Sequence, residues 1–468
     1  MDIVKNLAAA TVDRHPCPGV AWGVVRDGEL VAHGGEGVID VGTDEPPTCD
    51  TVYRIASMTK SFTCAAVLSL RDEGAVELDR PVAEAVPALA ALRGPEGSPR
   101  ITLRHLMSMS AGMATDDPWA DRHLDIDVDG LHAVVDAGVD FAIRTGDDFE
   151  YSNLGFGIIG RVIAEITGTR IREHVDERLL RPLGMTSTTW VQPSGRRWAR
   201  PHRRVSRALV ADGLDPLGDG EIAPMGGLWT TVSDLARWVA WLDAANLATP
   251  PVHGADRWLA ASSRREMQRI HNYSGHRTVA GRSVATGYGF GIRTFDDPTM
   301  GLSVGHAGGL PGYGSNMQWM RGRGLGVIAL SNVTYAPMER VTMRSLVELK
   351  EAGQLPDMPD LPDAAAQLVV DSGRRLIDLV TNWDDAVAER LFADNVALDD
   401  PFERRAVAAA DLLARHGGFE VIMLVASTRT SGSITARGTV SGLIFRIRFS
   451  LSPTGGIQWY ELPAAGEA

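Results

Sequence analysis

Hydrophobic and polar positions near the start of the chain predict a β-hairpin. Two apolar runs, residues 19–25 and 29–34, flank Arg26-Asp27-Gly28, and an Asp-Gly pair between two such runs is typical of a hairpin turn. From about residue 57 to residue 245 the apolar positions recur mainly at helical spacing. Strand-like runs return at residues 286–295, 302–305 and 325–331. The pattern therefore predicts strands at both ends of this part of the chain and helices in its middle.

A proline-rich stretch, residues 354–363, divides the chain and reads as a linker. The pattern predicts a first domain at residues 1–353 and a second at residues 364–468. For the second domain we expect helices at 364–382, 384–393 and 404–416, with a short strand around Val396 between the second and the third. Four strands follow at the end, at residues 419–426, 432–440, 443–451 and 457–462. Such a small α+β domain fits either an NTF2-like or a lipocalin-like fold.

Length and charge narrow the classes of function. A chain of 468 residues is too long for one ordinary hydrophobic core. Its formal net charge of -13 argues against wholesale binding of nucleic acid. Cys17, Cys49 and Cys64 lack paired spacing and predict no disulfide framework. No phosphate-binding glycine loop or cysteine/histidine metal cluster occurs, so we expect no cofactor and no metal.

Ser57 and Lys60 form the most informative pair in the sequence. They are three residues apart at the predicted start of an apolar helix, so they share one helix face. A partly desolvated amine can take the proton of a serine hydroxyl and activate it as a nucleophile. The free N–H groups of a helix N-terminus also favour a developing oxyanion. The chain has only three lysines, so a lysine falls three residues after a serine by chance less often than in a lysine-rich chain.

Two later motifs complete a pattern. Tyr151-Ser152-Asn153 precedes a second apolar helix, and His306-Ala307-Gly308 ends a strand-like run. In the order S-x-x-K, Y-x-N, H-x-G, the three motifs resemble the penicillin-recognising serine hydrolases, in which the third motif is commonly K-T-G. Three further stretches resemble the same class C β-lactamase and DD-peptidase family, at residues 101–113, 181–186 and 226–236. The resemblance covers roughly residues 10–340.

This resemblance implies a fold and a set of roles. The fold is a β-lactamase/transpeptidase-like antiparallel sheet with flanking helices and an inserted helical subdomain, with the active site in the cleft between them. Ser57 is expected to become acylated, and Lys60 and Tyr151 to shuttle its proton. The backbone N–H groups of Ser57 and of Gly309, next to Gly308 of the third motif, are expected to form the oxyanion hole. Asn153 is expected to hold the amide of the acyl group.

His306 stands where lactamases commonly keep lysine. Histidine titrates near pH 6.5, whereas lysine is charged at neutral pH, so the anchor for a β-lactam carboxylate is weakened. H-x-G resembles certain DD-peptidases, D-aminopeptidases and penicillin-binding-protein-type thioesterases. We therefore expect a serine hydrolase or acyltransferase for a peptide amide, ester or thioester, with a D-residue at the acyl position. The most specific hypothesis is a stand-alone thioesterase that releases and cyclises nonribosomal peptides. The alternative enzymes are a D-aminopeptidase, a DD-carboxypeptidase, an esterase or a β-lactamase. The alternative from another class is a non-catalytic binding protein.

The N-terminal residues bear on compartment. Residues 1–12 contain an early acid and lack the apolar core of a secretory signal, and no run of about 20 apolar residues predicts a membrane anchor. We expect a cytoplasmic protein without nucleic-acid or membrane partners.

Two other motifs are open to a functional reading. Asp125, Asp127, Asp129 and Asp136 approximate a calcium-loop spacing, but an acidic surface loop is the simpler reading. A dense basic segment surrounds Trp198 and His202, with arginines at 196, 197, 200, 203, 204 and 207. It is either a solvated loop or a docking site for a carboxylate, a phosphate or an acidic carrier protein.

Overall fold

The computed structural model describes residues 2–14, 17–195, 197–206, 208–212, 218–247, 251–279, 281–356 and 363–463. The chain divides into two compact units, Met1–Met358 and Pro359–Ala468. The predicted linker, 354–363, falls around this division, and its residues 357–362 lie outside the described residues. Each unit has a separate hydrophobic core.

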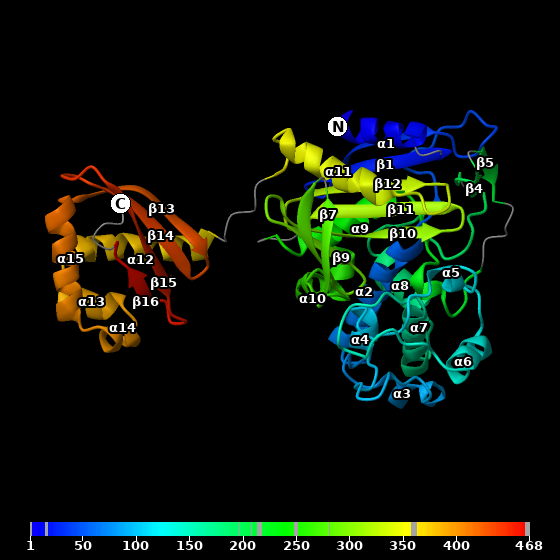
Figure 1. Cartoon of the computed structure of the whole chain (residues 1–468), viewed down its shortest axis with the longest axis horizontal. Coiled ribbons are helices and arrows are strands. Elements are labelled where there is room, and N and C mark those ends of the chain that lie inside the picture. The colour runs from blue at the N-terminus through cyan, green and yellow to red at the C-terminus, as the bar shows by residue number, and fades with distance from the viewer. Residues whose placement is uncertain are drawn as a thin grey trace. The chain divides into compact units, whose positions relative to one another are not determined.

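An eight-stranded antiparallel sheet forms the centre of the first unit (Figure 1). Its order is β2-β1-β12-β11-β10-β9-β8-β7. The strands are β1 (Gly19–Arg26), β2 (Glu29–Gly37), β7 (Asn272–Val279), β8 (Arg282–Tyr288), β9 (Arg293–Asp297), β10 (Gly301–Leu310), β11 (Tyr313–Met320) and β12 (Leu325–Ser331). The N-terminal hairpin therefore joins strands from the end of the unit through the pairing of β1 with β12, which confirms the predicted arrangement of strands at both ends.

Helices cover both faces of this sheet. Helices α1 (Asp2–Arg14) and α11 (Met338–Glu351) lie side by side on one face, and α9 (Val232–Ala244) packs on the other (Figure 1). Helix α2 (Thr59–Asp72) is buried from Thr59 to Leu70 at the heart of the main core. Its Phe62 ring stacks on Trp238 of α9 with centroids 3.9 Å apart. This tight packing fixes the helix that carries the candidate base.

The remaining helices of the first unit are mostly short. Several of them form the helical region below the sheet in Figure 1. Their bounds are α3 (Val82–Ala85), α4 (Leu103–Met107), α5 (Asp117–Ala120), α6 (Val128–Asp136), α7 (Leu154–Thr167), α8 (Ile171–Val175) and α10 (Ala261–Met267). Two small sheets pair β3 (Tyr53–Arg54) with β6 (Trp229–Thr230) and β4 (His202–Val205) with β5 (Ala208–Ala211). The fold is the expected β-lactamase/transpeptidase-like α+β architecture.

Two details of the predicted strands differ from the structure. The run at 286–295 is broken between β8 and β9, where Gly291 adopts φ +67°. A Cβ at Gly291 would lie 2.4 Å from the Lys60 carbonyl oxygen, so the turn lets the chain approach helix α2. The apolar pattern also missed β7 and β11. Strand β11 is buried at all eight positions, which removes the alternation that marks a half-buried strand.

The second unit has helices first and strands afterwards, as predicted. Its helices are α12 (Asp363–Thr381), α13 (Asp385–Leu391), α14 (Asp394–Asp399) and α15 (Phe402–His416). A four-stranded antiparallel sheet follows, formed by β13 (Phe419–Thr428), β14 (Ser431–Gly438), β15 (Ile444–Leu451) and β16 (Ile457–Glu461) in that order. The strand expected around Val396 is wrong: Val396 lies in the short helix α14 and buries its side chain in the core of this unit.

Candidate active site

Ser57 lies in a single 3₁₀ turn, Ala56–Met58, that leads directly into helix α2. The preceding Ala56 has φ +51°, a left-handed conformation that costs roughly 1–3 kcal/mol and persists only where packing enforces it. The backbone is enforced from the sheet side, because the Ser315 hydroxyl donates to the Ile55 carbonyl at 2.7 Å. The serine therefore lies in a strained turn at the start of a helix; the sequence predicts the position at the helix start but not the strain.

Lys60 is completely buried one turn later and meets Ser57. Its Nζ lies 3.0 Å from Ser57 Oγ, 2.7 Å from Asn153 Oδ1 and 2.9 Å from the Met225 carbonyl oxygen. Three partners match the three N–H groups of an ammonium. When one proton is lost, the amine still donates to Asn153 and Met225 and offers its lone pair to the serine hydroxyl.

Burial tunes this amine. Desolvation lowers the pKa of Lys60 from 10.5 to about 7, while the carboxylates of Asp117, Asp116 and Asp121 act in the opposite direction. Burial disfavours an ammonium, and nearby anions favour it. A lysine with a pKa near neutrality is half-deprotonated in ordinary buffers and suits a general base.

Tyr151 completes the proton path. Its hydroxyl is hydrogen-bonded to Ser57, and burial raises its pKa above the usual value of 10.0. The phenol is therefore protonated at neutral pH and can give a proton to a leaving group. Lys60 Nζ lies 5.0 Å from the Tyr151 ring centroid, so the three side chains form one cluster.

Asn153 is held from both ends. Its Oδ1 accepts from Lys60, and its Nδ2 donates to Asp117 Oδ1 at 2.6 Å. Asp116 accepts the backbone N–H groups of Asn153 and Leu154, each at 2.7 Å, and so caps helix α7. The expected role of Asn153 in holding a substrate amide stays a prediction, because protein groups occupy both ends of its amide here. Sequence reasoning missed Asp116 and Asp117, which come from α5 and the residue before it.

His306 lies on β10 beside the cluster, buried and without a charge. Its Nε2 lies 2.9 Å from the Tyr288 hydroxyl and its Nδ1 2.5 Å from the Ala307 carbonyl oxygen. An N–H at Nδ1 and an acceptor at Nε2 satisfy both contacts, which is the neutral tautomer. Burial, Arg293 and Lys60 lower the pKa of His306 well below 6.5. The third motif therefore contributes no positive charge at neutral pH.

Arg293 supplies the cation that His306 lacks. It is half-buried at the start of β9, and its guanidinium carbon lies 5.2 Å from the Tyr151 ring centroid and 5.8 Å from that of Tyr288. Among the described residues it has no ion-pair partner. The sequence analysis missed Arg293, since nothing in its local pattern separates it from other strand arginines.

These groups line one cavity of about 560 Å³. Its wall includes Ser57, Tyr151, His306, Gly308 and Gly309 together with Arg293 and Asp117. A side chain at either of these two glycines would collide with its neighbours, with backbone at Gly308 and with a tyrosine ring at Gly309. A Cβ at Gly308 would lie 2.2 Å from the Ile55 carbonyl oxygen, and one at Gly309 2.3 Å from Tyr335 Cδ1. The structure thus gathers all the predicted site residues, with Lys60 and Asn153 directly behind the cavity wall.

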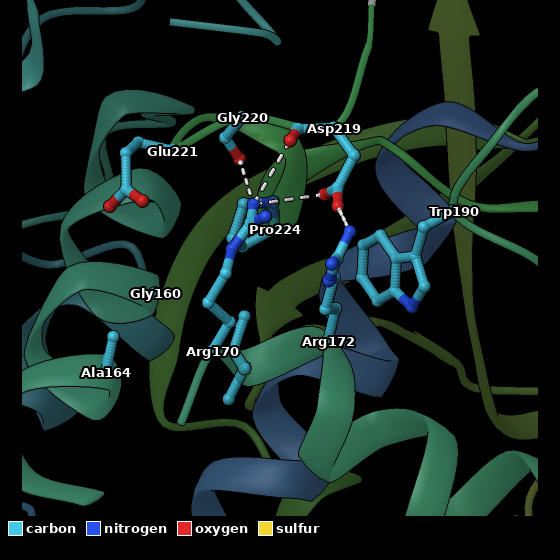
Figure 2. A pocket seen from close by; sticks show the side chains of 10 residues that line it. Gly160, Ala164, Arg170, Arg172, Trp190, Asp219, Gly220, Glu221 and Pro224 are labelled. Carbon is cyan, nitrogen blue, oxygen red and sulfur yellow. Dashed lines mark hydrogen bonds and ion pairs between the residues drawn. The ribbon is translucent and has the colours of Figure 1, made fainter. Parts of the chain in front are cut away.

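A much smaller cavity is lined by Arg170, Arg172, Asp219 and Pro224, among others (Figure 2). At about 10 Å³ it holds at most one water molecule. Arg170 and Arg172 both reach Asp219, and Arg170 also donates to the Asp219 carbonyl at 3.1 Å (Figure 2). This clamp fixes the segment that leads to Pro224 and to the Met225 carbonyl bound by Lys60. Its role is support rather than binding.

Two other motifs of the sequence contribute no described residue to the lining of this cavity. The expected acidic loop at residues 125–136 is mainly helix α6, where Asp127 caps the first turn by accepting from Gly130 N at 2.8 Å. Among the described residues no cluster of His, Cys, Asp or Glu forms a metal site. In the basic segment, Arg197 pairs with Glu45 at 2.7 Å and Arg200 lies over Trp198. Arg196 and Arg207 lie outside the described residues, and Arg203 and Arg204 are exposed on β4.

The described part of the chain contains three free cysteines, of which Cys17 and Cys64 are buried. None of the described helices is both long and apolar enough to cross a bilayer.

Comparison with known proteins agrees with this geometry. Residues 4–351 match the family model described as Beta-lactamase. Esterase EstB of Burkholderia gladioli is 27% identical over 353 residues, 67% of this chain and 86% of the esterase. Protein flp of Staphylococcus aureus (strain NCTC 8325 / PS 47) is 26% identical over 335 residues, 68% of this chain and 61% of flp, so the chain spans less than two thirds of that relative.

Solved structures support the fold. The octameric penicillin-binding protein homologue from Pyrococcus abyssi superposes with a TM-score of 0.64 at 19% identity, covering 98% of this chain and 95% of the homologue. The D-stereospecific amidohydrolase from Streptomyces sp. superposes with a TM-score of 0.58 at 22% identity, covering 75% of this chain and 98% of the amidohydrolase chain. The chain belongs to the Beta-lactamase family and is a beta-lactamase-like serine hydrolase.

Proposed function

We propose that this serine hydrolase works through an acyl-enzyme on Ser57 and acts on a peptidyl ester, thioester or amide with a D-residue at the acyl position. In its sharpest form it is a stand-alone thioesterase that releases and cyclises a nonribosomal peptide from an acidic carrier protein. The observation that carries the acyl-enzyme chemistry is the contact between Ser57 and the buried Lys60, whose pKa of about 7 makes it a base at neutral pH.

The proposed first step is acylation. Ser57 Oγ attacks the substrate carbonyl while Lys60 takes the hydroxyl proton, and the resulting oxyanion is stabilised by the backbone N–H groups of Ser57 and Gly309. The C–S, C–O or C–N bond then breaks. Tyr151 gives its proton to the leaving group and regains one from the Lys60 ammonium.

Deacylation reverses the proton path. An amine of the bound peptide, or water, attacks the acyl-serine and gives a proton through Tyr151 and Lys60 back to Ser57. An amine held near the acyl group gains a high effective concentration over water. Cyclisation therefore depends on how the cleft holds the tail of the peptide.

A neutral His306 favours the thioester form over a lactamase. A β-lactam presents a carboxylate, which the lysine of K-T-G anchors in many relatives, whereas a thioester carries no free carboxylate at the reacting end. The D-stereospecific amidohydrolase, which shares the fold, supports the expectation of a D-residue.

Arg293 favours the second candidate, a DD-carboxypeptidase or β-lactamase. An arginine without an ion-pair partner among the described residues, in the same cavity as Ser57, suits a substrate carboxylate. On this alternative Arg293 replaces the missing lysine charge. A D-aminopeptidase or an esterase uses the same Ser57 chemistry and differs only in how the rest of the substrate is held.

The test compares three substrates. Wild-type protein receives a peptidyl thioester with a C-terminal D-residue, the same thioester with the L-residue, and nitrocefin. We expect cyclic product from the D-thioester, little from the L-thioester and little turnover of nitrocefin. Mass spectrometry should place the acyl adduct on Ser57, and Ser57→Ala should lose on the order of 10³-fold or more in rate. Fast nitrocefin hydrolysis with only linear acid from the thioester, or an adduct on another serine, would refute the proposal.

A further inference from the structure

A second cavity, of about 620 Å³, adjoins the cleft that contains Ser57. We call it the basic groove. It lies between α1, the end of β7 and the first turns of α11, and it shares Arg277, Pro337, Glu339 and Arg340 with the wall of the catalytic cleft. The two cavities therefore share one wall, and the groove lies next to the cleft in which a leaving group departs from Ser57.

Charge distinguishes this groove from the rest of the chain. Three guanidinium groups, those of Arg277, Arg340 and Arg344, line the groove, and two carboxylates, those of Glu339 and Glu348, pair with two of them, which leaves an excess of one positive charge. The whole chain carries a formal net charge of -13, so a local excess of positive charge beside the active site runs against its general balance. A groove of this kind concentrates anions.

The arginines are available to a ligand. Arg277 pairs with Glu339 at 2.9 Å and Arg344 with Glu348 at 3.3 Å, but both arginine side chains are at least half exposed. Exposed pairs contribute about 0–1 kcal/mol and exchange readily for a better partner. Arg340 is exposed and has no ion-pair partner among the described residues. A phosphate accepts the paired N–H groups of arginine in a bidentate geometry.

The rest of the lining is mainly apolar. Leu7 and Ala10 of α1 and Val279 of β7 are partly exposed here, whereas Val341 and Met343 of α11 are buried beneath them. Such a surface suits a flexible chain of amides and methyl groups that ends in an anion, better than it suits a small inorganic ion alone.

We infer that the basic groove binds the phosphate of the thiol leaving group, a pantetheine 4′-phosphate arm of the kind that carrier proteins bear. The inference rests on the proposed thioester chemistry, because the leaving group of an amide or a simple ester has no such phosphate. It replaces the segment around Trp198 as the docking surface, since Arg277 and Arg340 of the basic groove also line the cleft, whereas none of the described arginines of that segment does.

The experiment measures competition against hydrolysis of the neutral ester p-nitrophenyl butyrate. The inhibitors are S-methyl pantetheine and S-methyl 4′-phosphopantetheine, in which the blocked sulfur cannot accept an acyl group. At low salt we expect the phosphorylated compound to have an inhibition constant at least about tenfold lower, which is the effect of about 1.4 kcal/mol from charge-assisted hydrogen bonds. The ratio should fall when salt is raised to 0.5 M, because the arginines are exposed.

Variants locate the phosphate. The double variant Arg340→Gln/Arg344→Gln should reduce the ratio of the two inhibition constants to below about twofold, and Arg340→Lys/Arg344→Lys should keep part of it. Arg204→Gln tests the rival basic segment, and Arg375→Gln on α12 is the matched control; both should keep the wild-type ratio. Equal inhibition by the two compounds, a ratio that survives in the double glutamine variant, or its loss in Arg204→Gln would overturn the inference.

The ester assay separates this inference from the proposed function. If the enzyme discriminates the two inhibitors through Arg340 and Arg344 but forms no product from the peptidyl thioester, the phosphate site in the groove is supported and the thioesterase function is refuted. If the enzyme cyclises the thioester but does not discriminate the inhibitors, the thioesterase function is supported and the phosphate site in the groove is refuted.

Discussion

Asp117→Asn should move the acid limb of the pH–rate profile to lower pH. The proposed base is the neutral amine of Lys60, so activity rises as pH increases through the Lys60 pKa, which is about 7. The Asp117 carboxylate raises that pKa by favouring the ammonium. An asparagine keeps an oxygen acceptor for Asn153 Nδ2 but removes the charge, so the amine loses its proton more readily.

The size of the shift follows from the geometry. Asp117 Oδ1 lies 2.6 Å from Asn153 Nδ2, and Asn153 Oδ1 lies 2.7 Å from Lys60 Nζ. The two charges are therefore separated by roughly the width of one amide and two hydrogen bonds, or about 7 Å. With an effective dielectric constant of about 20 their attraction is about 2 kcal/mol, which corresponds to between one and two pKa units.

The assay is kcat/KM for a neutral ester between pH 5 and pH 10. At pH 6 we expect activity to rise from about a tenth of the plateau in the wild type to more than half of it in Asp117→Asn. Asp129→Asn, an exposed change in the first turn of α6, is the matched control and should leave the profile in place. An acid limb that stays near pH 7 in Asp117→Asn, or that moves to higher pH, would refute the assignment of Lys60 as the base.

Two further sets of variants test the proton path and the strand edge. Lys60→Ala and Tyr151→Phe should each reduce kcat/KM strongly, and the double variant should lose much less than the product of the two effects, because the residues act as one relay; strictly additive losses would mean separate paths. Gly309→Ala should reduce kcat/KM more than tenfold, since its Cβ would lie 2.3 Å from the Tyr335 ring, and Tyr335→Ala in the same protein should recover part of the loss. No recovery would mean that the ring is not the obstacle.

Local spacing was sufficient to predict the contact between the nucleophile Ser57 and its base Lys60. Ser57 and Lys60 are three residues apart in a helical segment, so their contact follows from helix geometry alone. Tyr151 and His306 are distant in the chain and were found through family motifs rather than through spacing. The sequence pattern likewise predicted the N-terminal hairpin and the division into two parts, since each depends on local turn or linker residues.

The residues that set the charge of the site were out of reach of such reasoning. Asp117, Arg293 and the Met225 carbonyl reach Lys60 or its surroundings only because the tertiary fold brings α5, β9 and the Met225 turn together. A backbone carbonyl has no sequence signal at all. The strand expected around Val396 failed for a related reason, because a single buried apolar residue in a six-residue segment fits a short helix as well as a strand.

The energetics of Lys60 favour a catalytic role over a binding one. Its pKa is lowered from 10.5 to about 7, so between these pH values the unfolded chain binds more protons than the folded one, and the stability contributed by this residue rises with pH across that window. Below pH 7 the folded protein bears a penalty on the order of 5 kcal/mol from this one side chain. That is a large fraction of the stability of an ordinary domain. A ligand-binding protein gains nothing from such a group, whereas a serine hydrolase needs an amine that is neutral where it meets Ser57, and burial is what makes it so.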